Sequence, residues 1–206
     1  MLGPATILLD DTRGLEHVKF IFPTAHVMKV TGAKAFMNSW QDCFSFDYET
    51  REEDEQGFRV SASLIDDIIA REEREHSIPP NRVVIGGISQ GSSTALYTAL
   101  TSTRPLAGVF ILAGYIPLRG KIKQLISRPP PLPPIFWGHG RLDDRLKIDF
   151  SLDTARTLAS DLGVPFTEHV GSVHFVTYEQ LGHWMNEVEL LDLGAWFCAL
   201  LPKDFE

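Results

Sequence analysis

The residue best placed for covalent chemistry is Ser89, which stands in the sequence G-I-S-Q-G at residues 87–91. An apolar β-branched run, Val83–Ile85, precedes this segment, and a helical pattern of small and aliphatic residues follows it. Such a strand–turn–helix arrangement holds a serine hydroxyl at the end of the strand, above the first N–H groups of the helix. A hydroxyl in that position can attack a carbonyl carbon, and the N–H groups can stabilise the oxyanion that forms.

A serine hydroxyl needs a base that accepts its proton and an acid that orients the base. In strand–turn–helix folds of this kind the acid follows the serine in the chain, and the histidine follows the acid. Asp143 comes after the apolar run Ile135–Gly138, and His183 comes after the run Val173–Thr177. Because the carboxyl ends of parallel strands meet at one edge of a sheet, both side chains are expected beside Ser89. The sequence therefore predicts a triad of Ser89, Asp143 and His183.

Other polar residues fit this chemistry less well. His139 stands before Asp143, which reverses the required order, whereas His169 and His174 fall inside predicted strands. Asp144 lies one residue beyond the expected acid and is predicted to be a solvated surface charge. The sequence contains neither an H-E-x-x-H motif nor a cluster of cysteine and histidine residues, so it predicts no metal site and no cofactor.

Apolar strand patterns alternate with helical patterns from about residue 58 onward. This alternation predicts an α/β fold with a mostly parallel sheet and helices on both faces. Strands are expected at Val18–Phe22, Val83–Ile85, Leu106–Ala113, Ile135–His139, Phe166–Val170 and Val173–Thr177. One helix is expected to begin in the acidic stretch Asp47–Gln56 and to end at about His76, and another follows Ser89 directly. Further helices are expected within residues 114–127, at Leu152–Leu162 and at Trp184–Leu201.

Residues 24–47 lack a clear period and are predicted to form a long loop with a short extended piece near Trp40. Trp40 is the candidate substrate-binding residue of this loop, although it and the neighbouring aromatic residues could instead pack the loop onto the domain. The run of prolines within residues 129–134 could bind an SH3-type domain or could form a stiff loop that leads into the next strand.

The composition fits one domain spanning residues 1–206, with 44% hydrophobic and 22% charged residues. A net charge of −8 argues against a nucleic-acid surface. No apolar run is long enough to span a membrane, and the sequence that follows Met1 lacks the basic region of a signal peptide. Cys43 and Cys198 are too few for a disulfide framework. We therefore expect a cytoplasmic protein with reduced thiols.

Several segments, taken together, resemble the acyl-protein thioesterase / phospholipase–carboxylesterase family of α/β-hydrolases. The segments that carry the resemblance are G-I-S-Q-G at residues 87–91, H-G-x-x-D at residues 139–143 and Gly182-His183. Supporting segments are H-V-K-F-I-F-P at residues 17–23, S-W-Q-D at residues 39–42 and I-P-P-N-R-V at residues 78–83. The resemblance extends from about residue 14 to the C-terminus.

The resemblance implies the α/β-hydrolase fold and a serine hydrolase that cleaves acyl esters or thioesters without a cofactor. The implied substrates are S-acylated proteins, such as palmitoylated ones, and lysophospholipids, so transient contact with a membrane surface is expected. In this family Ser89 would be the nucleophile, Asp143 the orienting acid and His183 the base. The backbone N–H of Gln90 would donate a hydrogen bond to the oxyanion.

Members of the family usually open with a strand that ends in His-Gly-Leu-Gly-Asp, a loop that supplies another oxyanion donor. Nothing in residues 1–16 matches this loop, so the sequence predicts an N-terminally truncated member of the fold. Two alternatives therefore stay open. One is a catalytically impaired family member that binds acyl ligands or partners, and the other is a carboxylesterase for small esters.

Overall fold

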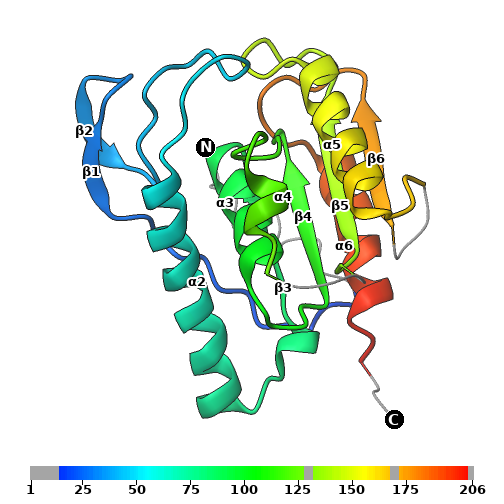
Figure 1. Cartoon of the computed structure of the whole chain (residues 1–206). Coiled ribbons are helices and arrows are strands. Elements are labelled where there is room, and N and C mark those ends of the chain that lie inside the picture. Colours follow the sequence, from blue (N-terminus) through cyan, green and yellow to red (C-terminus); the bar gives the residue numbers. More distant parts are fainter. Residues whose placement is uncertain (1–13, 128–131, 168–171, 204–206) are drawn as a thin grey trace.

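A four-stranded parallel sheet lies at the centre of the protein (Figure 1). The computed structural model describes residues 14–127, 132–167 and 172–203. The strands of the sheet, in spatial order, are β3 (Val84–Ile88), β4 (Gly108–Leu112), β5 (Ile135–Gly140) and β6 (Val173–Tyr178). Each strand pairs in parallel with the next one along the chain. The predicted parallel sheet is therefore confirmed.

Helices connect the strands and cover both faces of the sheet (Figure 1). They are α2 (Glu55–His76), α3 (Gln90–Thr101), α4 (Ile122–Leu125), α5 (Ile148–Leu162), α6 (Glu187–Leu200) and the 3-10 turn η1 (Pro80–Arg82). On one face, Leu96 of α3 and Leu158 of α5 share a buried cluster with Trp137 of β5. On the other face, Trp196 of α6 packs on Phe136. Because successive side chains of a strand point to opposite faces, β5 contributes to both cores.

Capping groups set the ends of the longest helix, α2. The Asp54 side chain accepts a hydrogen bond from the N–H of Gly57 at 2.9 Å, so the helix begins at Glu55. Ser77 ends the helix in the left-handed conformation, with φ 56°. Its N–H bonds back to the last turn of the helix, as in other left-handed helix ends.

The closing helix is shorter than expected. It begins at Glu187 rather than Trp184, because the Asn186 side chain accepts from the N–H of Glu189 at 2.9 Å and caps the helix there. Trp184 lies before the cap and is 54% exposed. The segment around it therefore belongs to the loop that follows β6, at the same sheet edge as the end of β3.

The segment Val18–Phe22 is not the buried strand that its composition predicts. Within the described residues β3 pairs only with β4, and Phe22 is 51% exposed. Phe20 packs its ring near that of Phe197 in α6, with 6.4 Å between the ring centroids. An apolar, β-branched composition indicates an extended chain but does not supply a strand partner, so these side chains dock on a helix instead.

Residues 24–47, expected to form a loop, contain an antiparallel hairpin of β1 (Val27–Val30) and β2 (Ala35–Asn38) (Figure 1). Every residue of β2 is exposed. This strand therefore lacks the alternation of apolar and polar residues by which a half-buried strand is recognised. The prediction of a loop is wrong for this part of the segment, and the hairpin stands at the side of the domain.

Some expectations fall outside the described residues. They concern residues 1–13, whose sequence does not match the family's opening loop, residues 129–131 of the proline run, and residues 168–170 of the strand expected at Phe166–Val170. Phe166 itself forms an isolated parallel bridge with Val173. That residues 1–206 form one domain stays a prediction. In the part of the chain that the structure describes, no helix is long and apolar enough to cross a membrane.

Glu189 of α6 is a carboxyl group in the protein interior. It is 0% exposed and lies against β5, where a Cβ added at Gly138 would be 2.3 Å from its Oε1. Neither carboxyl oxygen has a hydrogen-bond partner among the described residues. Burial, with a further contribution from Asp192, raises the pKa of Glu189 to about 8. The group is therefore protonated in the folded protein at neutral pH and ionised in the unfolded chain.

This difference predicts that the free energy of unfolding falls as the pH rises from about 5 to about 8, because the folded state binds the additional proton. One such group gives a slope of about 1.4 kcal/mol per pH unit. Glu189→Gln keeps the shape of the side chain and should remove this slope, so its stability relative to the wild type increases toward pH 8. Urea unfolding at several pH values measures the effect. The same pH dependence in both proteins would contradict a buried neutral carboxyl.

Candidate active site

Ser89 occupies the sharp turn between β3 and α3. Its backbone has φ 54° and ψ −117°, an unusual conformation for a residue with a side chain. The chain passes so close to itself here that a Cβ added at Gly87 would be 2.8 Å from the carbonyl carbon of Gly91. The N–H of Ser89 donates to the carbonyl of Leu112 in β4 at 2.8 Å. This hydrogen bond fixes the turn to the sheet and helps to offset the strain of the Ser89 backbone, which is about 1–3 kcal/mol.

The structure brings Ser89, His183 and Asp143 together. His183 Nε2 lies 2.8 Å from Ser89 Oγ, and His183 Nδ1 lies 2.8 Å from Asp143 Oδ2. The three residues follow β3, β6 and β5, so all of them lie beyond the carboxyl ends of parallel strands. The Asp143 side chain is fully buried and that of His183 is 10% exposed. His183 can accept the proton of Ser89 while Asp143 holds its ring in place.

The Asp143 carboxylate is fixed from several sides. Its Oδ1 accepts from the backbone N–H groups of Arg145 at 2.9 Å and Leu146 at 2.8 Å, while Oδ2 faces His183 and His139. Burial by itself would raise the pKa of Asp143. The hydrogen bonds from His139 and His183 outweigh burial and hold the pKa well below its usual range. The carboxylate is therefore ionised at neutral pH and can only accept hydrogen bonds.

His139 lies next to Asp143. The order of residues in the chain argues against His139 as the base. The residue is fully buried, and its Nε2 lies 2.9 Å from the Leu146 carbonyl oxygen and 3.3 Å from Asp143 Oδ2. Since both neighbours accept hydrogen bonds, Nε2 carries the proton of the ring. His139 is thus a second histidine that donates to Asp143, and it does not compete with His183 for Ser89. The available signal was the H-G-x-x-D spacing, in which the turn after β5 returns Asp143 to the strand end.

Two other polar residues, Asp144 and His174, lie outside the group formed by Ser89, Asp143 and His183. Asp144 is exposed, in keeping with a surface charge. His174 is partly buried in β6, where its ring meets that of Phe136 edge-on at 5.7 Å. His169 lies outside the described residues.

Gln90 and Trp40 lie together beside the turn at Ser89. Gln90 is the first residue of α3, and the first N–H groups of a helix have no acceptor within the helix. Its side chain accepts from the N–H of Trp40 at 3.1 Å and donates to the carbonyl of Gln41 at 2.9 Å. The Trp40 indole reaches Gly91, where an added Cβ would be 3.9 Å from Nε1. The roles of Gln90 as oxyanion donor and Trp40 as substrate contact stay predictions.

Aromatic and charged side chains also gather around Tyr48, in the segment between β2 and α2, and no local pattern in the sequence indicates them. The Arg51 guanidinium lies 4.4 Å from the centre of the Tyr48 ring and donates to the Tyr115 hydroxyl. The Tyr115 hydroxyl in turn donates to Glu53 at 2.8 Å. Burial raises the pKa values of Glu53 and Tyr115. We call residues 48, 51, 53 and 115 the Tyr–Arg cluster.

A sequence profile of the phospholipase/carboxylesterase family matches residues 6–197. The chain belongs to this family. It is similar to acyl-protein thioesterase 1 of Mycosarcoma maydis, with 32% identity over 203 residues that cover 95% of this chain and 83% of the relative. It is 34% identical over 199 residues to acyl-protein thioesterase 1 of Neurospora crassa, covering 92% of this chain and 76% of the relative. The resemblance drawn from the motifs is thereby confirmed.

Solved structures of relatives share the fold. Arabidopsis thaliana SOBER1 superposes with a TM-score of 0.82 at 25% identity, covering 97% of this chain and 93% of the other. Acyl-protein thioesterase 2 of Zea mays has a TM-score of 0.72 at 23% identity, covering 87% and 80%, which supports the fold alone. The chain therefore has the α/β-hydrolase fold that the sequence predicts, and it is a member of a carboxylesterase and thioesterase family.

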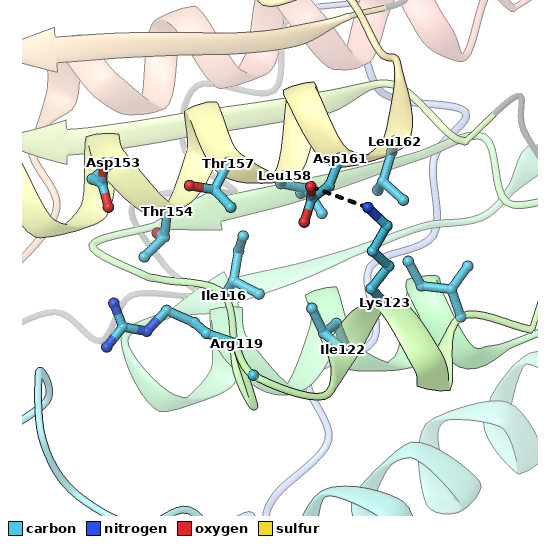
Figure 2. A pocket seen from close by; sticks show the side chains of 12 residues that line it. Ile116, Arg119, Ile122, Lys123, Asp153, Thr154, Thr157, Leu158, Asp161 and Leu162 are labelled. Carbon is cyan, nitrogen blue, oxygen red and sulfur yellow. Dashed lines mark hydrogen bonds and ion pairs between the residues drawn. The ribbon is translucent and has the colours of Figure 1, made fainter.

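A cavity of about 310 Å³ lies between α4 and α5 (Figure 2). Its wall includes Ile116 and Leu158, with Arg119 toward one end and the Lys123–Asp161 ion pair, at 3.3 Å, toward the other (Figure 2). Ser89, Asp143 and His183 are not among the residues that line this cavity. Within the described ranges, no group of three histidine, cysteine, aspartate or glutamate side chains could hold a metal ion.

The contact between His139 and Asp143 predicts an effect on turnover. His139→Leu removes this donor, so Asp143 would hold His183 less firmly. The kcat for p-nitrophenyl acetate should then fall about 10-fold to 100-fold, because one hydrogen bond to a charged group contributes about 1.5–3 kcal/mol. His139→Gln retains an N–H donor and should lose less. Thermal unfolding of both variants separates this effect from loss of fold. A folded His139→Leu protein with wild-type kcat would show that one histidine suffices to orient the acid.

Proposed function

We propose that the protein is a serine hydrolase that cleaves carboxylic esters or thioesters through an acyl-enzyme on Ser89. The observation that carries this proposal is the line of contacts from Ser89 Oγ through His183 to Asp143, each 2.8 Å long. The hydroxyl is the nucleophile, the imidazole is the base and the carboxylate is its counter-charge, so the reaction needs no cofactor.

In the first half of the reaction, His183 Nε2 accepts the proton of Ser89 as Oγ attacks the acyl carbon. The backbone N–H of Gln90 donates to the oxyanion. His183 then gives the proton to the leaving group, which departs as an alcohol or a thiol. In the second half, His183 accepts a proton from the attacking water and returns it to Ser89 as the carboxylic acid leaves. Asp143 stabilises the imidazolium in both halves.

S-acylated proteins and lysophospholipids are the substrates we propose. Relatives 32% and 34% identical to this chain are named acyl-protein thioesterases, and the family is that of phospholipases and carboxylesterases. The hairpin β1–β2 supports brief contact with a membrane surface, because Val27, Phe36 and Met37 are 64%, 75% and 48% exposed. Exposed apolar side chains can enter the lipid interface, where acylated substrates lie.

Hydrolysis of small esters is a second candidate, and the Tyr–Arg cluster favours it. A long alkyl chain laid against Arg51 and Glu53 would remove water from polar groups without offering them hydrogen bonds. A short acyl group on Ser89 would not extend over them. The length of the acyl chain that the site accepts therefore distinguishes the two candidates.

A fluorophosphonate probe tests the nucleophile. The wild-type protein should be labelled, because the probe reacts with a serine activated by a neighbouring base, and Ser89→Ala should lose all label. Ser63→Ala, a change at an exposed serine of α2, is the matched control and should label like the wild type. Persistent labelling of Ser89→Ala would refute the assignment. A wild-type protein that takes no label but binds palmitate would favour the impaired family member.

Steady-state rates on esters of different length test the substrate class. If acylated proteins and lipids are the substrates, kcat/KM should rise from p-nitrophenyl acetate to the octanoate ester, and a palmitoylated cysteine peptide should release free thiol. The gain per buried CH₂ group is about 0.8 kcal/mol, or about 4-fold in kcat/KM, while the chain remains in contact with the protein. A kcat/KM that falls steadily from acetate onward, with no thiol release, would instead establish the small-ester enzyme.

A further inference from the structure

The side chain of Gln90, the residue that follows the nucleophile, bonds to segment 39–41, which comes directly after β2. Its Oε1 accepts from the backbone N–H of Trp40 at 3.1 Å, and its Nε2 donates to the carbonyl oxygen of Gln41 at 2.9 Å. The same Nε2 donates to Ser39 Oγ at 2.8 Å, and that hydroxyl donates its one proton to the Gln41 carbonyl at 2.7 Å. The side-chain amide thus bonds a backbone N–H and a backbone carbonyl, as a peptide group does in a sheet.

Segment 39–41 is itself fixed to the two helices that flank it. Ser61 of α2 donates to the Trp40 carbonyl, and Thr94 of α3 donates to Gln41 Oε1 at 3.0 Å. Gln41 is only 2% exposed. Because buried hydrogen bonds are not exchanged for bonds to water, the segment forms a fixed wall to which the Gln90 side chain is attached.

The peptide group between Ser89 and Gln90 carries the N–H that donates to the oxyanion in the proposed reaction. Its carbonyl oxygen accepts from Ser92 Oγ at 2.6 Å and from the N–H of Ser93 at 3.2 Å, both in the first turn of α3. Because a trans peptide group is planar, the N–H of Gln90 points away from this carbonyl and from the body of the helix. Two sets of bonds therefore fix the direction of the N–H, one on the Ser89 carbonyl and one on the Gln90 side chain.

We propose that the Gln90 side chain is a positioning residue for acyl transfer, which holds the oxyanion N–H in place by bonding to segment 39–41. This role rests on the proposed acyl-enzyme on Ser89. The side chain makes no bond to the substrate and gives up no proton. An oxyanion donor is effective when it already points to the place where charge develops, and a misplacement of about 1 Å can lower the rate about 100-fold. Loss of the side-chain bonds should therefore weaken binding of the transition state more than binding of the ester.

Gln90→Met tests this role, because methionine keeps the length of the side chain and the backbone N–H but bonds to neither Trp40 nor Gln41. We expect kcat for p-nitrophenyl acetate to fall about 10-fold to 100-fold with KM little changed. A trifluoromethyl ketone, which forms an anionic adduct with the serine, should bind more weakly by a similar factor. Ser102→Ala is the matched control, because it removes a 3.0 Å bond to Asp66 at the other end of α3 and should leave both values unchanged.

Gln90→Glu gives a second test through its pH dependence. A neutral carboxyl group has a donor and an acceptor, like the amide, whereas a carboxylate only accepts and would face the Gln41 carbonyl. That carbonyl and the partial burial favour the neutral form, so the pKa of the new carboxyl should lie above the ordinary value of about 4.3. The kcat of Gln90→Glu, relative to the wild type at the same pH, should therefore rise as the pH falls from about 8 to about 5. Gln90→Met should show no such recovery.

Wild-type kcat and wild-type affinity for the ketone in Gln90→Met would overturn the proposal, since they would show that the N–H needs no support from the side chain. A Gln90→Glu protein whose kcat keeps the same ratio to the wild type at every pH would also overturn it. Thermal unfolding checks that the variants fold, and if Gln90→Met does not, the pH series of Gln90→Glu decides. Failure of the underlying function gives a different result: the wild type itself would neither hydrolyse the ester nor react with a fluorophosphonate.

Discussion

The site depends on the hydrogen bonds that hold the ionised carboxylate of Asp143, which is buried in the turn that follows β5. A buried charge is stable only when hydrogen bonds replace its water, and here two backbone N–H groups and two histidines replace it. The carboxylate determines which nitrogen of His183 carries a proton, and it leaves Nε2 as the acceptor that faces the Ser89 hydroxyl at 2.8 Å. The parallel sheet makes this possible, because it places the three strand ends along one edge.

Two buried carboxyl groups near β5 show that burial alone does not decide the charge. Asp143 has hydrogen-bond donors on both oxygens and stays ionised, whereas Glu189 has none among the described residues and has a pKa of about 8. The first group serves the site as a fixed negative charge. Glu189 fills the space next to Gly138 as a neutral side chain, against the strand that leads to Asp143. Environment thus gives opposite states to two acids, one in the turn that follows β5 and one on the helix that packs against β5.

The sequence predicted the sheet and the meeting of Ser89, Asp143 and His183, because each lies directly after an apolar strand pattern and strand ends converge. It did not predict the parts of the site that depend on returning turns and distant segments. His139 reaches Asp143 only through the turn after β5, and the Arg51 guanidinium donates to the Tyr115 hydroxyl from a distant segment of the chain. The sequence does not predict the hairpin β1–β2, because β2 is exposed along its whole length and so has no core-facing pattern.

The central claim is that the acyl group of the substrate passes through Ser89. Mass spectrometry of the protein, acid-quenched during the initial burst of p-nitrophenol from p-nitrophenyl acetate, tests it most directly. We predict an acetyl group on the peptide that carries Ser89, in an amount that matches the burst and that disappears once the ester is exhausted. A burst whose acetyl group is found on another residue would contradict this account of the site.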